Sequence, residues 1–189
     1  MGRMTMVIAG VGLGVGLGAG LLAVPALADE RTCEGRVGAV TLDDVRVPEG
    51  ATCALTGTRV KGTVKVERGA TLVARGVKVT GDVQGENARS VSVGRSSSVG
   101  GNVQVKQGGA ASVTSSRVDG DIQYDANRGG LKVRGSQVGG NVQVVGNRGT
   151  AEITGNRVKG DLQCKENSPA PKGGANTVAG DKEDQCAGL

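Results

Sequence analysis

The chain has 189 residues, a formal net charge of +5 and an unusual composition, with 35 glycines, one aromatic residue (Tyr124) and no histidine. Without histidine it lacks the usual general base and metal ligand, and it can hold no Ser/His/Asp or Cys/His arrangement. Aromatic side chains supply much of the buried area of globular cores, so this core has to be built from Val, Ala, Leu and Ile, which suits a narrow tube.

The N-terminal segment 1–28 has the features of a cleaved export signal. Arg3 gives a positively charged start, residues 6–24 form an apolar, glycine-rich run, and residues 26–28 (Ala-Leu-Ala) before Asp29 match a signal-peptidase site. We therefore predict that residues 1–28 are a signal peptide and that the protein is secreted to the extracellular space. An uncleaved membrane anchor is the alternative, since the run is close to the minimum length for a span, but its glycines make a weak helix. Membrane contact is expected only through this segment, before cleavage.

Without Arg3, 22 basic and 18 acidic residues remain, a net charge of +4, and they are dispersed along the chain. Nucleic-acid binding would call for a basic patch interleaved with stacking aromatic residues, so no nucleic-acid partner is expected. The sequence favours a simply solvated surface. Weak attraction to anionic cell-surface polymers is the alternative. A cell-wall or extracellular polymer is the one partner class that the composition leaves open.

One phrase recurs along the chain, clearest as RVDGDIQY (117–124), QVGGNVQV (137–144) and RVKGDLQC (157–164). Its glycines stand at nearly constant intervals, at Gly62, Gly81, Gly101, Gly120, Gly140, Gly160 and Gly180. A fixed period of about 20 residues is typical of a solenoid, in which each repeat buries its apolar face against its neighbours.

Within each repeat, apolar residues alternate with polar ones over short segments, which is the period of a strand with one buried face. Each coil contains about three such strands, separated by corners rich in Gly, Asn and Ser, which tolerate positive φ where a turn needs it. The apolar residues recur in columns: two residues before the repeat glycine (Val60 to Val178), two after it (Val64 to Leu162), four after it (Val66 to Cys164) and midway round the coil (Leu72 and Ala74 to Ala151 and Ile153).

We therefore predict an all-β, single-domain parallel β-helix of about 7 to 8 coils, with about 20 residues per coil, over residues 29–189. Residues 29–44 are an N-terminal cap, 45–164 the coils, and 165–189 a C-terminal cap that begins with a loop over 165–177. A right-handed coil is expected, since crossovers between parallel strands usually have that hand.

Four cysteines lie in the exported part, and an even number in an oxidising compartment favours disulfides. The members of each of the two close pairs are about one coil apart, and residues one coil apart stack at roughly 4.8 Å, within the Cα separation that a disulfide tolerates. We predict the bonds Cys33–Cys53 and Cys164–Cys186, which tie the two ends. Zinc is the alternative, disfavoured because the sequence lacks close CxxC pairs and histidine. No metal or other cofactor is expected.

The residue after each repeat glycine is short and carries oxygen: Thr63, Asp82, Asn102, Asp121, Asn141, Asp161 and Asp181. From Asp82 to Asp161 the central five residues alternate Asp and Asn, which keeps these carboxylates two rungs apart and avoids like charges on neighbouring strands. The favoured interpretation is structural, with these side chains bonded to backbone groups at the corner. A calcium ladder, or a catalytic pair of carboxylates about 9 to 10 Å apart, is the functional alternative.

A second polar column, two residues further on, holds Lys65, Gln84, Gln104, Gln123, Gln143 and Gln163. It alternates with the valine columns, so we expect it to point outward. Stacked amides can hydrogen-bond along the axis. A flat face bearing Gln and Thr could instead bind a polysaccharide or ice, although carbohydrate sites usually add aromatic platforms and only Tyr124 is available.

The phrase V-x-G-D/N-V-Q-V, with GAT or RGG corners over residues 45–164, resembles the repeats of bactofilins, bacterial scaffolds whose right-handed β-helix polymerises end to end. Bactofilins are cytosolic, whereas this chain has an export signal and two cysteine pairs. In its plan of signal, repeats and C-terminal cysteine cap, the chain is more similar to uncharacterised secreted bacterial β-solenoid proteins. That resemblance implies the fold and secretion and brings no activity with it.

The leading hypothesis for function is a secreted, non-enzymatic β-helix protein with a structural or cell-envelope interaction role. The second is a polysaccharide-binding module or adhesin that uses the face bearing Gln and Thr. A polysaccharide-degrading enzyme such as a lyase is less favoured, because such enzymes need longer coils, projecting loops and a carboxylate or arginine cluster. In such an enzyme, Asp82, Asp121 or Asp161 would be the catalytic carboxylates.

Overall fold

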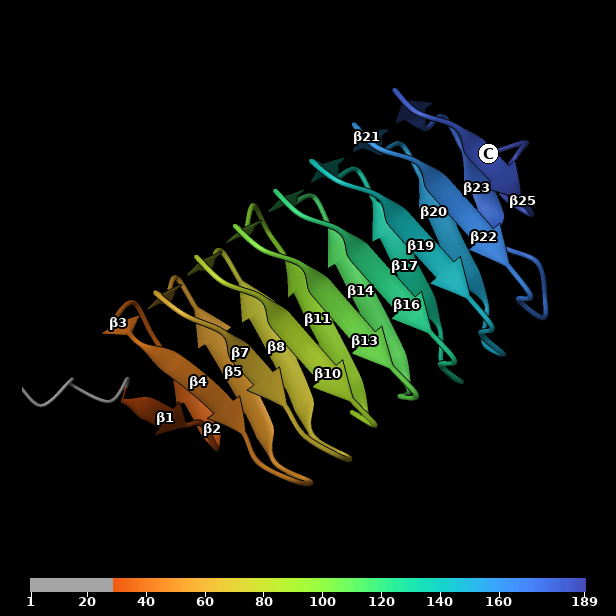
Figure 1. The fold of residues 1–189 in the computed structure, drawn as a ribbon. Helices are drawn as coiled ribbons and strands as arrows, with labels where there is room; N and C mark the ends of the chain where they lie inside the picture. Colours follow the sequence, from red (N-terminus) through yellow and green to blue (C-terminus); the bar gives the residue numbers. More distant parts are fainter. Residues whose placement is uncertain (1–28) are drawn as a thin grey trace, which may run out of the picture.

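The chain winds round one axis as a series of short strands, and in each strand apolar residues alternate with polar ones. The computed structural model describes residues 29–189, which run as a continuous coil from one end of a rod to the other (Figure 1). The predicted signal peptide, residues 1–28, lies outside the described residues. Residues 29–189 form strands and no helix, so this part of the chain has no helix that could cross a bilayer.

Each turn of the coil contributes one strand to each of three parallel sheets, called here wall A, wall B and wall C. Wall A contains β1 (Glu30–Thr32), β4 (Asp44–Val47), β7 (Val64–Val66), β10 (Val83–Glu86), β13 (Val103–Lys106), β16 (Ile122–Asp125), β19 (Val142–Val145), β22 (Leu162–Lys165) and β25 (Lys182–Asp184). Wall B contains β2 (Gly35–Val37), β5 (Thr52–Thr56), β8 (Thr71–Arg75), β11 (Ser90–Gly94), β14 (Ala110–Thr114), β17 (Leu131–Arg134), β20 (Ala151–Thr154) and β23 (Lys172–Gly174). Wall C contains β3 (Thr41–Leu42), β6 (Arg59–Val60), β9 (Lys78–Val79), β12 (Ser98–Val99), β15 (Arg117–Val118), β18 (Gln137–Val138), β21 (Arg157–Val158) and β24 (Thr177–Val178).

Strands one turn apart pair in parallel, residue over equivalent residue. In wall A, Gln104 lies between Gln84 and Gln123; in wall C, Val99 lies between Val79 and Val118. Wall A has nine strands and the other two walls have eight each, so residues 29–189 complete about eight turns of about 20 residues. The predicted all-β parallel solenoid is confirmed.

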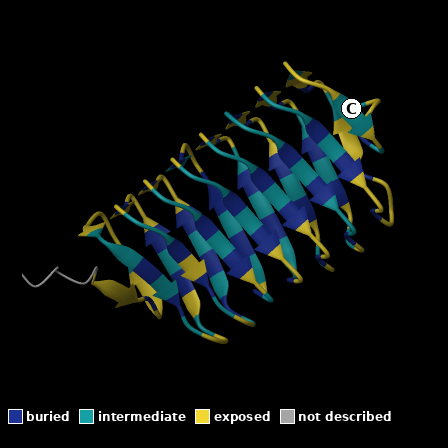
Figure 2. Ribbon diagram, in the orientation of Figure 1, coloured by how far each residue is buried: buried dark blue, intermediate teal, exposed yellow. Residues whose placement is uncertain are grey.

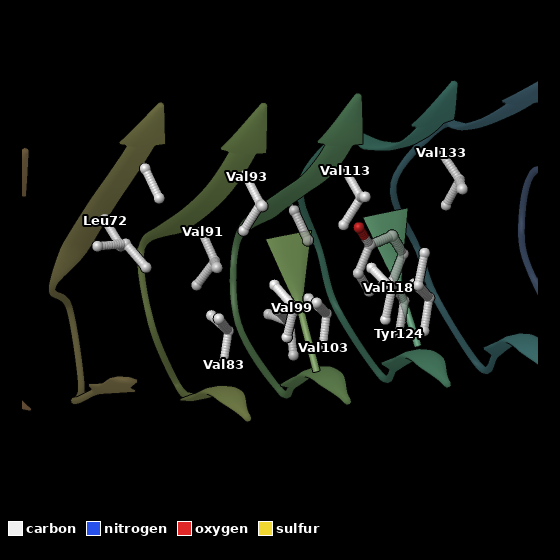
Figure 3. Close-up of a cluster of buried hydrophobic side chains, with 14 of the residues drawn as sticks. Leu72, Val83, Val91, Val93, Val99, Val103, Val113, Val118, Tyr124 and Val133 are labelled. Carbon is white, nitrogen blue, oxygen red and sulfur yellow. The ribbon is translucent and has the colours of Figure 1, made fainter. Parts of the chain in front are cut away.

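The core is a narrow column of small apolar side chains. Buried and more exposed residues alternate along each strand (Figure 2), and the predicted apolar columns are the ones that face inward. Figure 3 shows how Leu72, Val91, Val99 and Val113 from different turns gather in the interior. Because each side chain packs on its counterparts one turn away, the core continues from turn to turn along the axis.

Tyr124 is part of this core and is only 1% exposed (Figure 3). It lies between Val105 and Val144 in the same inward column, and its hydroxyl donates to the backbone oxygen of Lys132 at 3.5 Å. Burial raises the pKa of the Tyr124 hydroxyl, so the ring stays neutral. It cannot act as an aromatic platform on the surface, because it faces the inside of the rod.

The ends of the chain are wound like the middle, so the two segments predicted as caps also pair in the walls. Residues 29–44, predicted as an N-terminal cap, contain β1, β2 and β3, one strand in each wall. The predicted loop 165–177 contains β23, and the C-terminal segment continues through β24 and β25. The outermost turns have a neighbour on one side only, so fewer of their side chains are buried and the valine pattern fades there; none of the residues of β1 is buried. The backbone pairing therefore extends further than the apolar pattern does.

One disulfide fastens each end of the rod. Cys33 is bonded to Cys53 and Cys164 to Cys186, with Cα atoms 5.5 and 5.1 Å apart. All four residues are buried, and each bond joins one turn to the next. This is the pairing that the spacing of the cysteines predicts.

Candidate functional site

The residues that follow the repeat glycines form a hydrogen-bonded ladder at the corner between walls C and A. The backbone N–H of Asn102 donates to Oδ1 of Asp82 at 2.7 Å, and the N–H of Asp121 donates to Oδ1 of Asn102 at 2.8 Å. The same bond links four more pairs: Asp44 and Thr63, Asp121 and Asn141, Asn141 and Asp161, Asp161 and Asp181. The column has the structural role that the sequence favours, and its partner is the backbone of the next turn.

This ladder explains why the preceding residue is glycine. A Cβ atom added to Gly140 would overlap Oδ1 of Asp121, and Gly101 and Gly160 have the equivalent oxygen in the same place. The same obstacle stands at Gly62, Gly120 and Gly180. None of these glycines has a left-handed φ, so a lack of space selects glycine here rather than the shape of a tight turn.

The ladder uses one oxygen of each carboxylate that a catalytic or calcium-binding site would need. Asp82, Asp121 and Asp161 are two turns apart, with an asparagine between successive carboxylates, and each holds a backbone N–H through Oδ1. Across residues 29–189, no three acidic, cysteine or histidine side chains converge as metal ligands would. The contacts of the three aspartates thus support a role in holding turns together.

Two further polar ladders, which the sequence interpretation missed, line the other two corners. Between walls A and B, the N–H of Asn127 donates to Oδ1 of Asn147 at 2.8 Å, and Nδ2 of Asn147 donates to the backbone oxygen of Tyr124 at 2.9 Å. Between walls B and C, the N–H of Asn156 donates to Oδ1 of Asn176 at 3.0 Å. These asparagines are buried, and every buried side-chain nitrogen and oxygen in residues 29–189 has a partner.

The signal for these ladders is present in the sequence. Asn127, Asn147 and Asn167 recur once per repeat, as do Asn156 and Asn176. Asparagine between strands is usually taken as an exposed turn residue. When asparagine returns once per coil, its side chain can stack on its own copies. It can then hydrogen-bond to the backbone groups that a tight corner leaves unpaired.

The predicted binding face is a continuous column on the outside of wall A. Gln84, Gln104, Gln123, Gln143 and Gln163 lie in register and are all half-buried. Nε2 of Gln104 donates to Oε1 of Gln123 at 3.1 Å, Nε2 of Gln84 to Oδ2 of Asp82, and Nε2 of Gln163 to Oε2 of Glu183. The structure thus brings together all five predicted residues, and part of their hydrogen-bonding capacity is already used within the wall.

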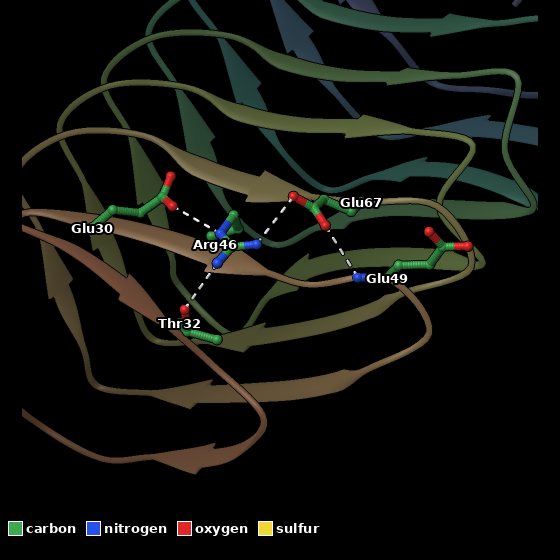
Figure 4. Close-up of polar contacts among 5 residues, drawn as sticks. All are labelled: Glu30, Thr32, Arg46, Glu49 and Glu67. Atoms are coloured by element: carbon green, nitrogen blue, oxygen red, sulfur yellow. Dashed lines mark hydrogen bonds and ion pairs between the residues drawn. The ribbon is translucent and has the colours of Figure 1, made fainter.

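The N-terminal end of this column carries charge instead of amides. Arg46, one turn before Lys65, donates from Nε to Oε1 of Glu30 at 2.8 Å and from Nη2 to Oγ1 of Thr32, and its Nη1 lies 3.5 Å from Oε1 of Glu67 (Figure 4). The hydrogen bond to Glu30 and the charge of Glu67 raise the pKa of Arg46. These side chains are more than a third exposed, so the cluster orders the first turns without adding much stability.

An open hollow lies beside this end of the glutamine column. It is lined by Lys65, Arg68, Gln84, Glu86 and Lys106, among others, and so mixes basic, acidic and amide groups. It extends the glutamine face without giving it a distinct charge.

The contact between glycine and ladder can be tested with a double-mutant cycle. Gly140→Ala should lower the free energy of unfolding by about 2 kcal/mol, because the new methyl group overlaps Oδ1 of Asp121. In an Asp121→Gly background the same change should cost less than half as much, since the obstructing oxygen is gone. Gly130→Ala, whose Cβ would make only an ordinary contact with Thr150, is the control. Denaturant unfolding of the four proteins measures the coupling, and strictly additive costs would contradict the explanation.

Comparison with known proteins finds no match, neither to a protein-family model nor to a curated protein nor to a solved structure. The function of the rod therefore has to be inferred from the chemistry of its walls and corners.

Proposed function

We propose that this chain is a secreted, non-enzymatic β-helix protein with a structural or cell-envelope interaction role. The observation that carries the proposal is the disulfide at each end of the rod. Structural disulfides persist in oxidising compartments outside the cytoplasm, in line with the signal-like character of residues 1–28. Each bond fastens a terminal turn, where a rod of stacked repeats has a neighbour on one side only.

The hydrogen bonding of the corners supports a structural role. Each of the three corners carries a ladder of side chains that bond from turn to turn, as Asp121, Asn147 and Asn156 do. Sliding or bending one turn over the next would break these bonds as well as those of the backbone. Such a rod holds its three walls straight and its outward side chains at fixed intervals, which suits repeated contact with an extended partner.

The surface composition fits this role. Among residues 29–189, Val40 is the one large hydrophobic side chain that is exposed, at 50%. A rod with polar walls remains soluble at the cell surface and meets partners through hydrogen bonds and charge.

A second candidate is a polysaccharide-binding module or adhesin, favoured by the in-register column of five glutamines on wall A. Amides spaced by one turn, roughly 4.8 Å, offer donors and acceptors in a straight row to the hydroxyls of a neutral glycan. The candidate is weaker because Tyr124 faces inward, so the wall has no aromatic platform.

Export and oxidation test the main proposal. When the full chain is expressed with its own N terminus in a secreting bacterial host, we expect a mature protein that starts at Asp29, is found outside the cytoplasm and has no free thiol. N-terminal mass mapping, cell fractionation and thiol labelling before and after reduction provide the readouts. A full-length protein retained in the cytoplasm with reduced cysteines would contradict the proposal.

The second candidate is tested by replacing glutamines of the column with lysine. A Gln104→Lys and Gln143→Lys variant should keep the fold, because Lys65 already occupies the same column, and should lose any binding to neutral glycans. A Ser92→Lys and Ser112→Lys variant on wall B, where Lys132 occupies that column, is the matched control. Failure of the unmodified protein to bind any neutral glycan on an array would remove this candidate.

A further inference from the structure

The winding of the chain gathers basic side chains on the outside of wall C. Each strand of this wall has two residues, of which the first points outward and the second faces the core. The outward column reads, turn by turn, Thr41, Arg59, Lys78, Ser98, Arg117, Gln137, Arg157 and Thr177. Half of these positions are basic and none is acidic, although the same charges are dispersed along the sequence.

Further basic residues flank this column. Lys61 and Lys159 directly follow the inward valines of β6 and β21, and Arg75, Arg95 and Arg134 stand at the adjoining corner with wall B. All are exposed. These residues, with the four of the column, are called the basic band: Arg59, Lys61, Arg75, Lys78, Arg95, Arg117, Arg134, Arg157 and Lys159.

Few acidic groups neutralise the band. Asp43 pairs with Lys61 at 2.9 Å and Asp119 with Arg117 at 2.6 Å, whereas the other seven basic residues form no ion pair within residues 29–189. The band with these two aspartates has a net charge of +7, and the rest of residues 29–189, with 13 basic and 16 acidic residues, has −3. Four carboxylates of the corner ladder lie along the far edge of wall C, half-buried, each with an oxygen held by a backbone N–H: Asp44, Asp82, Asp121 and Asp161.

The geometry of the band fits a long partner better than a small one. Arg117 and Arg157 are two turns apart, roughly 10 Å, and Lys78 continues the same straight row. A small anion would meet one or two of these exposed groups and bind weakly. A polymer with charges repeated along its length would meet many at once, and each further contact would form within the same complex.

The side chains also indicate the kind of anion. Six of the nine residues are arginines, whose planar guanidinium forms paired hydrogen bonds with carboxylate and other oxyanions. Single-stranded nucleic acid would be expected to stack its bases on aromatic residues, and Tyr124 is buried. An anionic membrane would be expected to take up apolar side chains, whereas the valines of wall C face inward.

We propose that the basic band binds an extended anionic polysaccharide whose units carry carboxylate or sulfate groups. The polymer lies along the rod axis on wall C. This inference rests on the proposed envelope role, for which it names a partner class and a surface.

The test compares two variants with the same net charge. In the first, Arg59, Lys78, Arg117 and Arg157 are changed to Gln, a residue that already stands in the column as Gln137. In the second, the matched control, the exposed Lys65, Lys106 and Lys165 of wall A and Lys172 of wall B are changed to Gln. The oxidised mature proteins are titrated with polygalacturonate, dextran sulfate and uncharged dextran at low and at physiological salt. Circular dichroism and thermal unfolding check that each variant is folded.

The unmodified protein should bind one or both acidic polymers and not dextran, with weaker binding at higher salt and to short oligosaccharides of the same units. The wall C variant should bind about tenfold more weakly or worse, while the control should stay within about twofold of the unmodified protein. Polygalacturonate and dextran sulfate separate carboxylate from sulfate recognition. Equal losses in the two variants would mean that net charge alone drives binding, and would overturn the proposal.

Two other results would overturn it as well: unchanged binding by the wall C variant, and tighter capture of single-stranded DNA or phosphatidylglycerol vesicles than of either acidic polysaccharide. A different measurement, that of export and cysteine oxidation, tests the proposed function. A protein that is exported and oxidised but binds no acidic polymer retains its structural role and loses this inference. A cytoplasmic, reduced protein contradicts the proposed function, whatever its purified form binds.

Discussion

The pairing of each turn with the next, in parallel and in register, is the constraint on which the rest of the structure depends. It sets every residue beside its counterparts in the turns before and after, as in the stack of Val83, Val103 and Ile122. A property that recurs once per turn therefore becomes a continuous column in space. The core, the corner ladders, the glutamine face and the basic band are columns of this kind. Their different chemistry follows from the place on the turn at which each residue type recurs.

The columns that face the core could be predicted because buried valines and cysteines have few acceptable replacements, so their spacing is regular enough to detect. The winding of the terminal segments was harder to predict, because strands such as β1 bury few side chains and keep their register by backbone bonds that leave little trace in the sequence. The repeat glycines were visible, but the reason for them was not. Two facts are needed to explain Gly140: its φ is not positive, and Oδ1 of the Asp121 side chain lies where its Cβ would be.

The surface was harder to predict than the core. The glutamine column follows directly from strand alternation, whereas the buried Asn127 and Asn147 look like ordinary turn residues until the corner is seen in space. The basic band joins residues from two adjacent parts of each turn, such as Arg134 and Arg157, and none of its positions is basic in every repeat. Charge dispersed along a chain can thus be concentrated round a rod. The three walls that result differ in chemistry, and the ladders hold them at fixed positions.

The most direct test of the account is a cross-linking experiment on the register of wall A. Cysteines placed at Gln104 and Gln123, which lie beside each other on adjacent turns, should form a disulfide readily on mild oxidation, because one rung of roughly 4.8 Å is within disulfide range. Cysteines at Gln104 and Gln143, two rungs apart, should remain free thiols in the monomer. Peptide mapping that finds the second pair bonded as readily as the first, or neither pair bonded in a folded protein, would contradict the stacked coil.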